Sequence, residues 1–164
     1  MKNKVAVITG GSSGIGEALA YKFSQENFNI VITGTNKDRL NNVLSKIKKN
    51  GVSCEGVIHD ISSSNDVKKM VDISIRKFGR IDVLICNAGI SIRSLFEDLD
   101  LNTFEKLFRI NFLGTVYSVK HSLPHLIKTS GTIIGISSLN GFIATPTRTA
   151  VSYTHLTLPT TYGV

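Results

Sequence analysis

The chain has 164 residues, a formal net charge of +7, 41% hydrophobic residues and 19% charged residues. This balance fits one globular domain with a substantial core, and no apolar run reaches the roughly 20 residues that a membrane-spanning helix needs. Basic residues alternate with acids along the predicted helices, which favours a solvated surface over a nucleic-acid interface. We therefore expect neither membrane nor nucleic acid as a partner. Residues 1–4, Met-Lys-Asn-Lys, lead directly into a predicted strand, unlike a signal peptide. We therefore expect a cytoplasmic location.

Two kinds of segment alternate along the first 137 residues. Short β-branched runs predict strands over residues 5–8, 29–33, 52–58, 81–86 and 131–137. Apolar residues at helical spacing lie between these runs, and the stretch from about Thr103 to Thr129 reads as one long helix. Strands that alternate with helices are typical of a doubly wound parallel sheet, so the sequence predicts the α/β class.

A glycine-rich turn follows the first predicted strand. Its sequence, Thr-Gly-Gly-Ser-Ser-Gly-Ile-Gly over residues 9–16, leads directly into a predicted helix. Such a turn lets main chain approach a ligand and directs a helix N-terminus at a phosphate. A simple strand-to-helix connection that needs positive φ is the alternative. If the turn holds a nucleotide, the residues that bind it are Thr9, Gly10, Ser12, Ser13, Gly14, Ile15 and Gly16.

The spacing of the glycines separates this turn from two well-known phosphate-binding motifs. Gly10, Gly14 and Gly16 form T-G-x-x-x-G-x-G, which does not fit G-x-G-x-x-G. A P-loop requires a Lys followed by Ser or Thr after the last glycine, and no such pair is present.

Polar or small residues also follow the later strands, at the edge of the sheet where ligands gather. The candidates are Asp60 and Ile61 after the third strand, Asn87, Ala88 and Gly89 after the fourth, and Ser138 after the fifth. Asn111 lies on the apolar face of the long predicted helix, where a buried amide needs hydrogen-bond partners. Each of these residues also has an ordinary structural explanation, as a turn former or a core residue tied to main chain. His121 and His125 lie one helical turn apart without a third ligand, so we predict no metal site.

Taken together, the glycine turn, the Asn-Ala-Gly triplet, Asn111 and Ser138 closely resemble the short-chain dehydrogenase/reductase family, over about residues 3–150. The resemblance implies a Rossmann-type sheet of five strands in the order 3-2-1-4-5. It also implies an NAD(P)-dependent oxidoreductase that transfers a hydride between a nicotinamide cofactor and a carbonyl or alcohol substrate. In this family the residue at Ser138 hydrogen-bonds the substrate carbonyl. The residue at Asn111 kinks the long helix and holds a water of the proton relay.

The end of the second strand bears on the choice of cofactor. An NAD-binding domain usually places an acid there to hold the ribose 2′-hydroxyl. The positions there are Gly34, Thr35, Asn36 and Lys37, with Arg39 close by, and none of these is an acid that would repel a 2′-phosphate. We therefore expect NADP(H) in preference to NAD(H), although Asn36 is equally suited to cap the next helix.

The resemblance fails at the two remaining catalytic positions. The family has a Tyr thirteen residues after the serine and a Lys four residues later, and these positions hold Val151 and His155. The Tyr exchanges a proton with the carbonyl oxygen while the Lys lowers its pKa, and valine has no proton to give. We expect this chain to be catalytically inactive. A non-catalytic nucleotide-binding domain with a regulatory or scaffold role is the alternative function.

Residues 151–164 differ in composition from the rest of the chain, because every Lys, Arg, Asp and Glu precedes them. Their sequence, Val-Ser-Tyr-Thr-His-Leu-Thr-Leu-Pro-Thr in its first ten residues, resembles a translated transposase-end adapter from sequencing libraries. We therefore expect an incomplete dinucleotide-binding domain over residues 1–150 and a disordered, non-native tail over 151–164. The natural gene would continue past Ala150 into the family's remaining strands, and the full-length parent would form a homo-oligomer.

Overall fold

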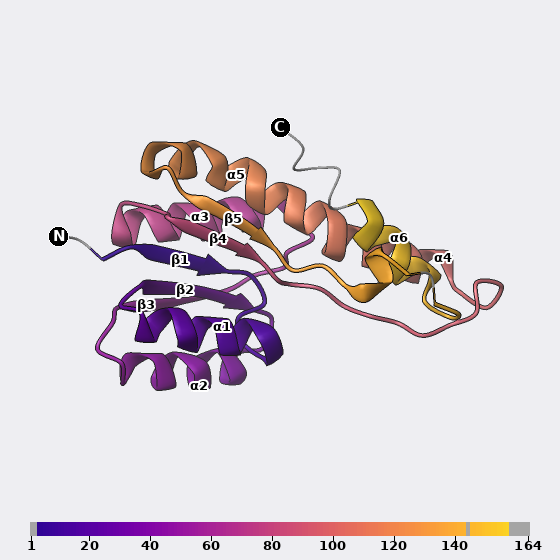
Figure 1. Ribbon diagram of the computed structural model, residues 1–164, viewed down its shortest axis with the longest axis horizontal. Coiled ribbons are helices and arrows are strands. Elements are labelled where there is room, and N and C mark those ends of the chain that lie inside the picture. Colours follow the sequence, from indigo (N-terminus) through magenta and orange to yellow (C-terminus); the bar gives the residue numbers. More distant parts are fainter. Residues whose placement is uncertain (1–2, 144, 158–164) are drawn as a thin grey trace.

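A computed structural model describes residues 3–143 and 145–157 as a parallel sheet between two layers of helices (Figure 1). The strands are β1 (Val5–Ile8), β2 (Asn29–Gly34), β3 (Cys54–Ile58), β4 (Val83–Cys86) and β5 (Thr132–Gly135). The helices are α1 (Gly14–Gln25), α2 (Lys37–Lys48), α3 (Ser64–Phe78), α4 (Leu101–Phe108), α5 (Gly114–Thr129) and α6 (Thr149–Thr157). A π-helical turn, Arg109–Leu113, joins α4 to α5, and a short 3₁₀ turn, Leu139–Gly141, follows β5.

The strand order confirms the predicted Rossmann-type fold. The five strands lie in the order β3-β2-β1-β4-β5, and every pairing is parallel. At the centre of the sheet, Val7 of β1 pairs with Val31 of β2 on one side and with Leu84 of β4 on the other. The chain crosses from β3 over the sheet to β4, so the carboxyl ends of β1 and β4 lie on either side of a topological switch point.

Alternate side chains of the strands fill two separate cores, as the twofold period of a strand requires. Val5 and Val7 pack toward α3 and α5, in a core that includes Met70. Ala6 and Ile8 point the other way, into a core with α1 and α2. Both cores cover the central strands completely, which explains why these strands are almost continuously apolar.

Polar side chains fix the beginnings of three helices. Asn36 accepts a hydrogen bond from the main-chain N–H of Arg39 at α2, and Ser63 accepts one from Asp66 at α3. Asp100 caps α4 in the same way, so this helix begins at Leu101 instead of the expected Thr103.

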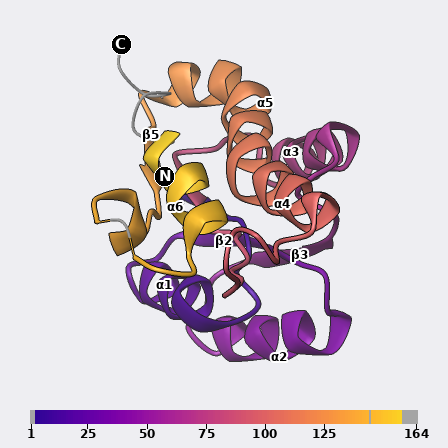
Figure 2. The ribbon, with the colours of Figure 1, turned by 90° about the vertical axis from the view of Figure 1, so that its right-hand side faces the viewer.

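Helices α4 and α6 lie beyond the carboxyl ends of the strands, the end that Figure 2 turns toward the viewer. We expected disorder from residue 151 onward, whereas the structure places Thr149–Thr157 in a helix; residues 158–164 lie outside the described part of the chain. Ala150 and Val151 are buried and pack with Leu107 of α4. This apolar contact packs α6 against α4, and the composition of the segment does not reveal it. Across residues 3–143 and 145–157, no helix is both long and apolar enough to cross a bilayer.

Candidate functional site

The glycine turn is packed so closely that side chains are excluded from it. Gly10 has φ +65°, and a Cβ on it would lie 2.8 Å from the Cα of Ala88. A Cβ on Gly16 would overlap the carbonyl of Gly10 and the amide of Asn87. Gly14 also has positive φ, but the space around it is open. The turn therefore needs glycine for two reasons. Gly14 adopts a positive φ that other residues rarely adopt, and at Gly10 and Gly16 the neighbouring atoms leave no room for a Cβ.

Two polar side chains hold this turn against the end of β4. The Thr9 hydroxyl donates to the carbonyl of Ile85 at 3.3 Å and accepts the N–H groups of Asn87 and Ala88, each at 3.0 Å. In return, the Asn87 amide donates to the carbonyls of Thr9 and Gly10 at 3.0 and 3.2 Å. The first turn of α1 is thereby held at a fixed position over the end of the sheet.

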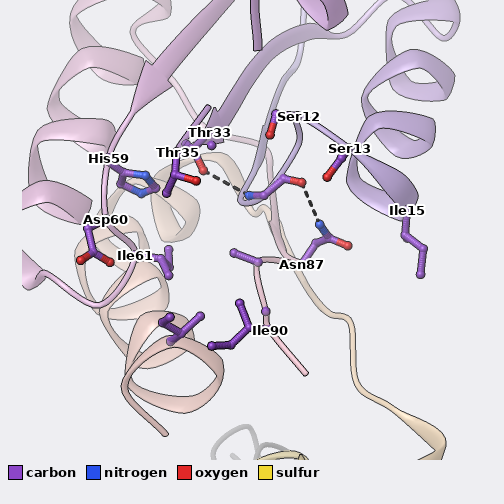
Figure 3. Close-up of a pocket in the computed structure, with 15 residues that line it drawn as sticks. Ser12, Ser13, Ile15, Thr33, Thr35, His59, Asp60, Ile61, Asn87 and Ile90 are labelled. Atoms are coloured by element: carbon purple, nitrogen blue, oxygen red, sulfur yellow. Dashed lines mark hydrogen bonds between the residues drawn. The ribbon is translucent and has the colours of Figure 1, made fainter. Parts of the chain in front are cut away.

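A pocket of about 380 Å³ opens beside the turn (Figure 3). Residues from the ends of β1, β2, β3 and β4 surround it, as expected for the ligand-binding edge of a doubly wound sheet. Of the predicted residues, its lining includes Gly10, Ser12, Ser13, Ile15, Thr35, Asp60, Ile61, Asn87, Ala88 and Gly89. Ile15, at the start of α1, is 62% exposed.

Four predicted cofactor residues lie outside the pocket lining. Thr9 and Gly16 position the turn through the contacts described above. Asn36 uses its side-chain oxygen to cap α2, the structural role that the sequence also allowed. Gly14, where α1 begins, likewise lies outside the lining residues.

The end of β2 contributes residues that the sequence reasoning missed. The Thr33 hydroxyl accepts a hydrogen bond from the N–H of Gly10 at 3.2 Å, which ties β2 to the glycine turn (Figure 3). A Cβ on Gly34 would overlap the side chain of Ser12, so close packing again requires glycine. These contacts join strands that are distant in sequence, and no local pattern signals them.

The end of β3 carries Asp60 and two largely buried neighbours. One oxygen of Asp60 accepts hydrogen bonds from both the N–H and the hydroxyl of Ser62, at 2.9 and 2.8 Å. His59 and Ile61 are each 8% exposed and border the pocket, although only Ile61 was predicted. Ile90 and Ile110 complete the apolar part of the lining, and neither stood out in the sequence.

Asn111 is 2% exposed and lies within the π-helical turn between α4 and α5. Its side-chain oxygen accepts from the N–H of Ile90 at 2.9 Å, and its amide donates to the carbonyl of Ile90 at 3.0 Å. The amide also lies 3.3 Å from the hydroxyl of Thr154. The buried amide is therefore fully paired, and it fixes the segment that follows β4. The single long helix that we predicted is interrupted here, since π turns distort a helix locally.

The predicted catalytic positions lie near one another in the fold, and none of them lines the pocket. Ser138 accepts a hydrogen bond from the N–H of Asn140 at 3.2 Å and so begins the 3₁₀ turn. Helix α6, which carries Val151 and His155, packs against that turn, and a Cβ on Gly141 would lie 3.2 Å from the carbonyl of His155. Val151 is 3% exposed, and burial holds the pKa of His155 below its usual range. Neither side chain offers the phenol or ammonium group of the family pattern.

A doubly wound parallel sheet with a glycine turn and a pocket at its switch point defines a nucleotide-binding domain of the Rossmann type. The family model described as short chain dehydrogenase matches residues 4–154, and the chain belongs to this family of oxidoreductases.

Similar proteins agree with this assignment. An uncharacterized oxidoreductase of Staphylococcus epidermidis strain RP62A is 36% identical over 93% of this chain, and one of Staphylococcus aureus strain MW2 is 33% identical over 94%. The chain spans 65% and 66% of the lengths of these two relatives.

Two solved structures share the fold. One is an alcohol dehydrogenase from Thermococcus sibiricus complexed with 5-hydroxy-NADP, with a TM-score of 0.90 and 28% identity over 93% of this chain and 66% of that one. The other is an NAD+-bound xylitol dehydrogenase, with a TM-score of 0.93 and 26% identity over 98% of this chain and 63% of that one. The family therefore binds nicotinamide cofactors, in both phosphorylated and unphosphorylated forms.

Proposed function

We propose that this chain binds NADP(H), in preference to NAD(H), in the pocket beside the glycine turn. We further propose that its full-length parent is an oxidoreductase acting on a carbonyl or alcohol substrate. The observation that carries the proposal is the contact of Gly10 with Ala88, which leaves room only for main chain beside the N-terminus of α1. A dinucleotide needs such a site, because its pyrophosphate binds to main-chain N–H groups at a helix N-terminus.

The residues around the pocket fit the parts of this cofactor. Ser12, Ser13 and the first turn of α1 offer hydroxyl and N–H donors for the pyrophosphate. Thr35 and Asn36, with Lys37 and Arg39, would hold the 2′-phosphate, and positions 34–37 at the end of β2 contain no carboxylate. The remaining residues would hold the adenosine half: Asp60, Ile61, Asn87, Ala88 and Gly89. When bound, the nicotinamide ring supplies or accepts the hydride.

We propose that the chain does not complete the reaction. Hydride transfer to a carbonyl needs a proton for the developing alkoxide, and the Tyr position holds Val151. Val151 is buried against Leu107, so this position is part of the core instead of facing a substrate. Ser138 and Asn111 remain, but a hydrogen-bond donor without a proton source does not complete the transfer.

The same observation favours the second candidate function, a non-catalytic nucleotide-binding domain with a regulatory or scaffold role. In this role the pocket would sense the cofactor, and the packing of α6 on α4 would serve stability alone. The two candidates differ in whether restoring the proton donor restores turnover.

A hydride-transfer assay tests the proposal directly. We would follow NADPH oxidation at a fixed chain concentration with a panel of simple aldehydes and ketones. The chain itself should give no turnover above background, and Val151→Tyr with His155→Lys should give measurable turnover if the site is otherwise intact. Turnover by the unaltered chain would contradict the proposed inactivity. Cofactor binding without turnover in either form would favour the non-catalytic function.

Location and assembly belong to the same proposal. A reductase of small carbonyl compounds that draws on the cellular NADP(H) pool would act in the cytoplasm. We propose that the full-length parent is a homo-oligomer there, with neither membrane nor nucleic acid as a partner. Sedimentation of the full-length protein would test the assembly.

A further inference from the structure

His59 is the least expected residue at the pocket. It directly follows β3, and its main-chain N–H donates to the carbonyl of Gly34 at 3.4 Å, which continues the pairing of β3 with β2. The side chain is 8% exposed and lies beside Thr35 at the pocket wall (Figure 3). The imidazole thus lies between Thr35, which is proposed for the 2′-phosphate, and Asp60, which is proposed for the adenosine half (Figure 3).

The imidazole has polar atoms that the folded chain does not satisfy. Within the part of the chain that the structure describes, neither Nδ1 nor Nε2 of His59 has a hydrogen-bond partner, and both nitrogens are shielded from solvent. A buried polar group without a partner destabilises a folded protein, so a residue kept at such a position calls for an explanation. Packing alone is a weak explanation, because Phe or Leu would fill the same space without burying an unpaired polar group.

The protonation state defines what the ring can bind. Burial holds the pKa of His59 below its usual range, opposed first by an interaction with its own main chain and then by the charges of Asp66 and Asp60. The ring is therefore neutral at pH 7 and offers one N–H donor and one acceptor nitrogen. Adenosine offers matching groups, since its ring nitrogens accept, and its amino group and ribose hydroxyls donate.

We propose that His59 is a binding residue for the adenosine half of the dinucleotide. A half-turn about the Cβ–Cγ bond exchanges the ring nitrogens with ring carbons at little cost in shape. This rotation would bring a nitrogen to the pocket wall, where the bound adenosine supplies the missing partner. The inference rests on the proposed function, because it requires that the pocket bind a dinucleotide. It predicts that His59 lowers the stability of the empty protein and raises its affinity for the ligand.

The test is calorimetric titration of NADP+ and of adenosine 2′,5′-bisphosphate, which lacks the nicotinamide half, together with melting of the ligand-free chain. His59→Phe should weaken both ligands about five- to tenfold, the loss of roughly one hydrogen bond. Its ligand-free melting temperature should equal or exceed that of the unaltered chain. His59→Gln, which keeps a donor and an acceptor, should retain more of the affinity. His125→Phe, the same change on α5 outside the pocket lining, should leave both affinities unchanged.

The outcomes separate the two proposals. Unchanged affinities in His59→Phe, with the unaltered chain binding both ligands, would overturn the role of His59 and leave the proposed function intact. A loss of affinity together with a lower ligand-free melting temperature would show that His59 is only structural, and would also overturn it. If the unaltered chain bound neither ligand, the proposed function would fail, and the role of His59 with it.

Discussion

The side-chain amide of Asn87 donates to the main-chain carbonyl of Thr9 at 3.0 Å, across 78 positions of sequence. A second bond from the same amide reaches the carbonyl of Gly10 at 3.2 Å. The glycine turn after β1 is therefore held by the residue that follows β4. Together with the Thr9 hydroxyl, this side chain connects the two strands on either side of the switch point, which is where a dinucleotide would lie.

Asn87→Ala removes both bonds and leaves two carbonyls without these partners. We expect a loss of about 1–3 kcal/mol in the free energy of unfolding, measured by urea denaturation. NADPH affinity should fall as well, because the turn would no longer be held in place. The matched control is Asn102→Ala, whose side chain is exposed and bonds only locally to Asp100; we expect a change within about 0.5 kcal/mol there. Equal stability of the two variants would contradict this role for Asn87.

Comparing Gly10→Ala with Gly51→Ala separates the cost of an unfavourable backbone conformation from the cost of a steric clash. Both have positive φ, +65° and +77°, but a Cβ on Gly51 would meet nothing within 4 Å. Substitution by Ala should cost about 1 kcal/mol at either position because of the left-handed backbone. At Gly10 the contact with Ala88 should add about 1–3 kcal/mol and abolish dinucleotide binding. Urea denaturation measures the first effect and NADPH fluorescence titration the second. If Gly10→Ala binds NADPH normally, the turn is not the phosphate site.

Thr35→Asp tests the proposed cofactor preference. A carboxylate at the end of β2 would repel the 2′-phosphate, so NADPH affinity should fall about tenfold or more. NADH affinity should stay the same or rise, since an acid there can accept from the 2′-hydroxyl. Thr35→Asn has nearly the same shape without the charge and should leave the preference for NADPH largely intact. A parallel loss of affinity for both cofactors in Thr35→Asp would point to misfolding of the loop instead of charge repulsion.

Two buried histidines predict a pH dependence of stability. Burial lowers the pKa of both His59 and His155 in the folded chain, whereas in the unfolded chain both titrate near 6.5. Below pH 6.5 the unfolded chain therefore binds more protons, and stability falls as the pH is lowered. Urea denaturation should show a lower free energy of unfolding at pH 5.5 than at pH 7.5. The double variant with His59→Phe and His155→Phe should show a weaker dependence over the same interval, and an unchanged slope would contradict the assignment.

The sequence predicted the architecture well because each strand of the central sheet is a short apolar run bounded by turn residues. Boundaries were less accurate where tertiary contacts decide them. The long helix begins earlier than expected because Asp100 caps it, and it is interrupted where Asn111 bonds to Ile90. Hydrophobic spacing records which face is buried, but it does not record hydrogen bonds between segments about twenty residues apart.

The candidate site was predicted from motifs, so residues outside motifs were missed. Thr33 and His59 lie at strand ends and look like ordinary strand residues in the sequence, yet both border the pocket. Helix α6 was not predicted for a related reason, because burial of Val151 against Leu107 depends on a helix some forty residues earlier. Ser138 lies outside the pocket lining and caps a turn, and its catalytic role stays a prediction.

The most direct test of the account is a titration of the unaltered chain with NADPH and, in parallel, with NADH, followed by the fluorescence of the reduced nicotinamide. The account predicts saturable binding of both at one site per chain, with NADPH the tighter ligand. Tighter binding of NADH would contradict the assignment of Thr35 and its neighbours to the 2′-phosphate, and no saturable binding of either would contradict the central claim that this pocket holds a dinucleotide.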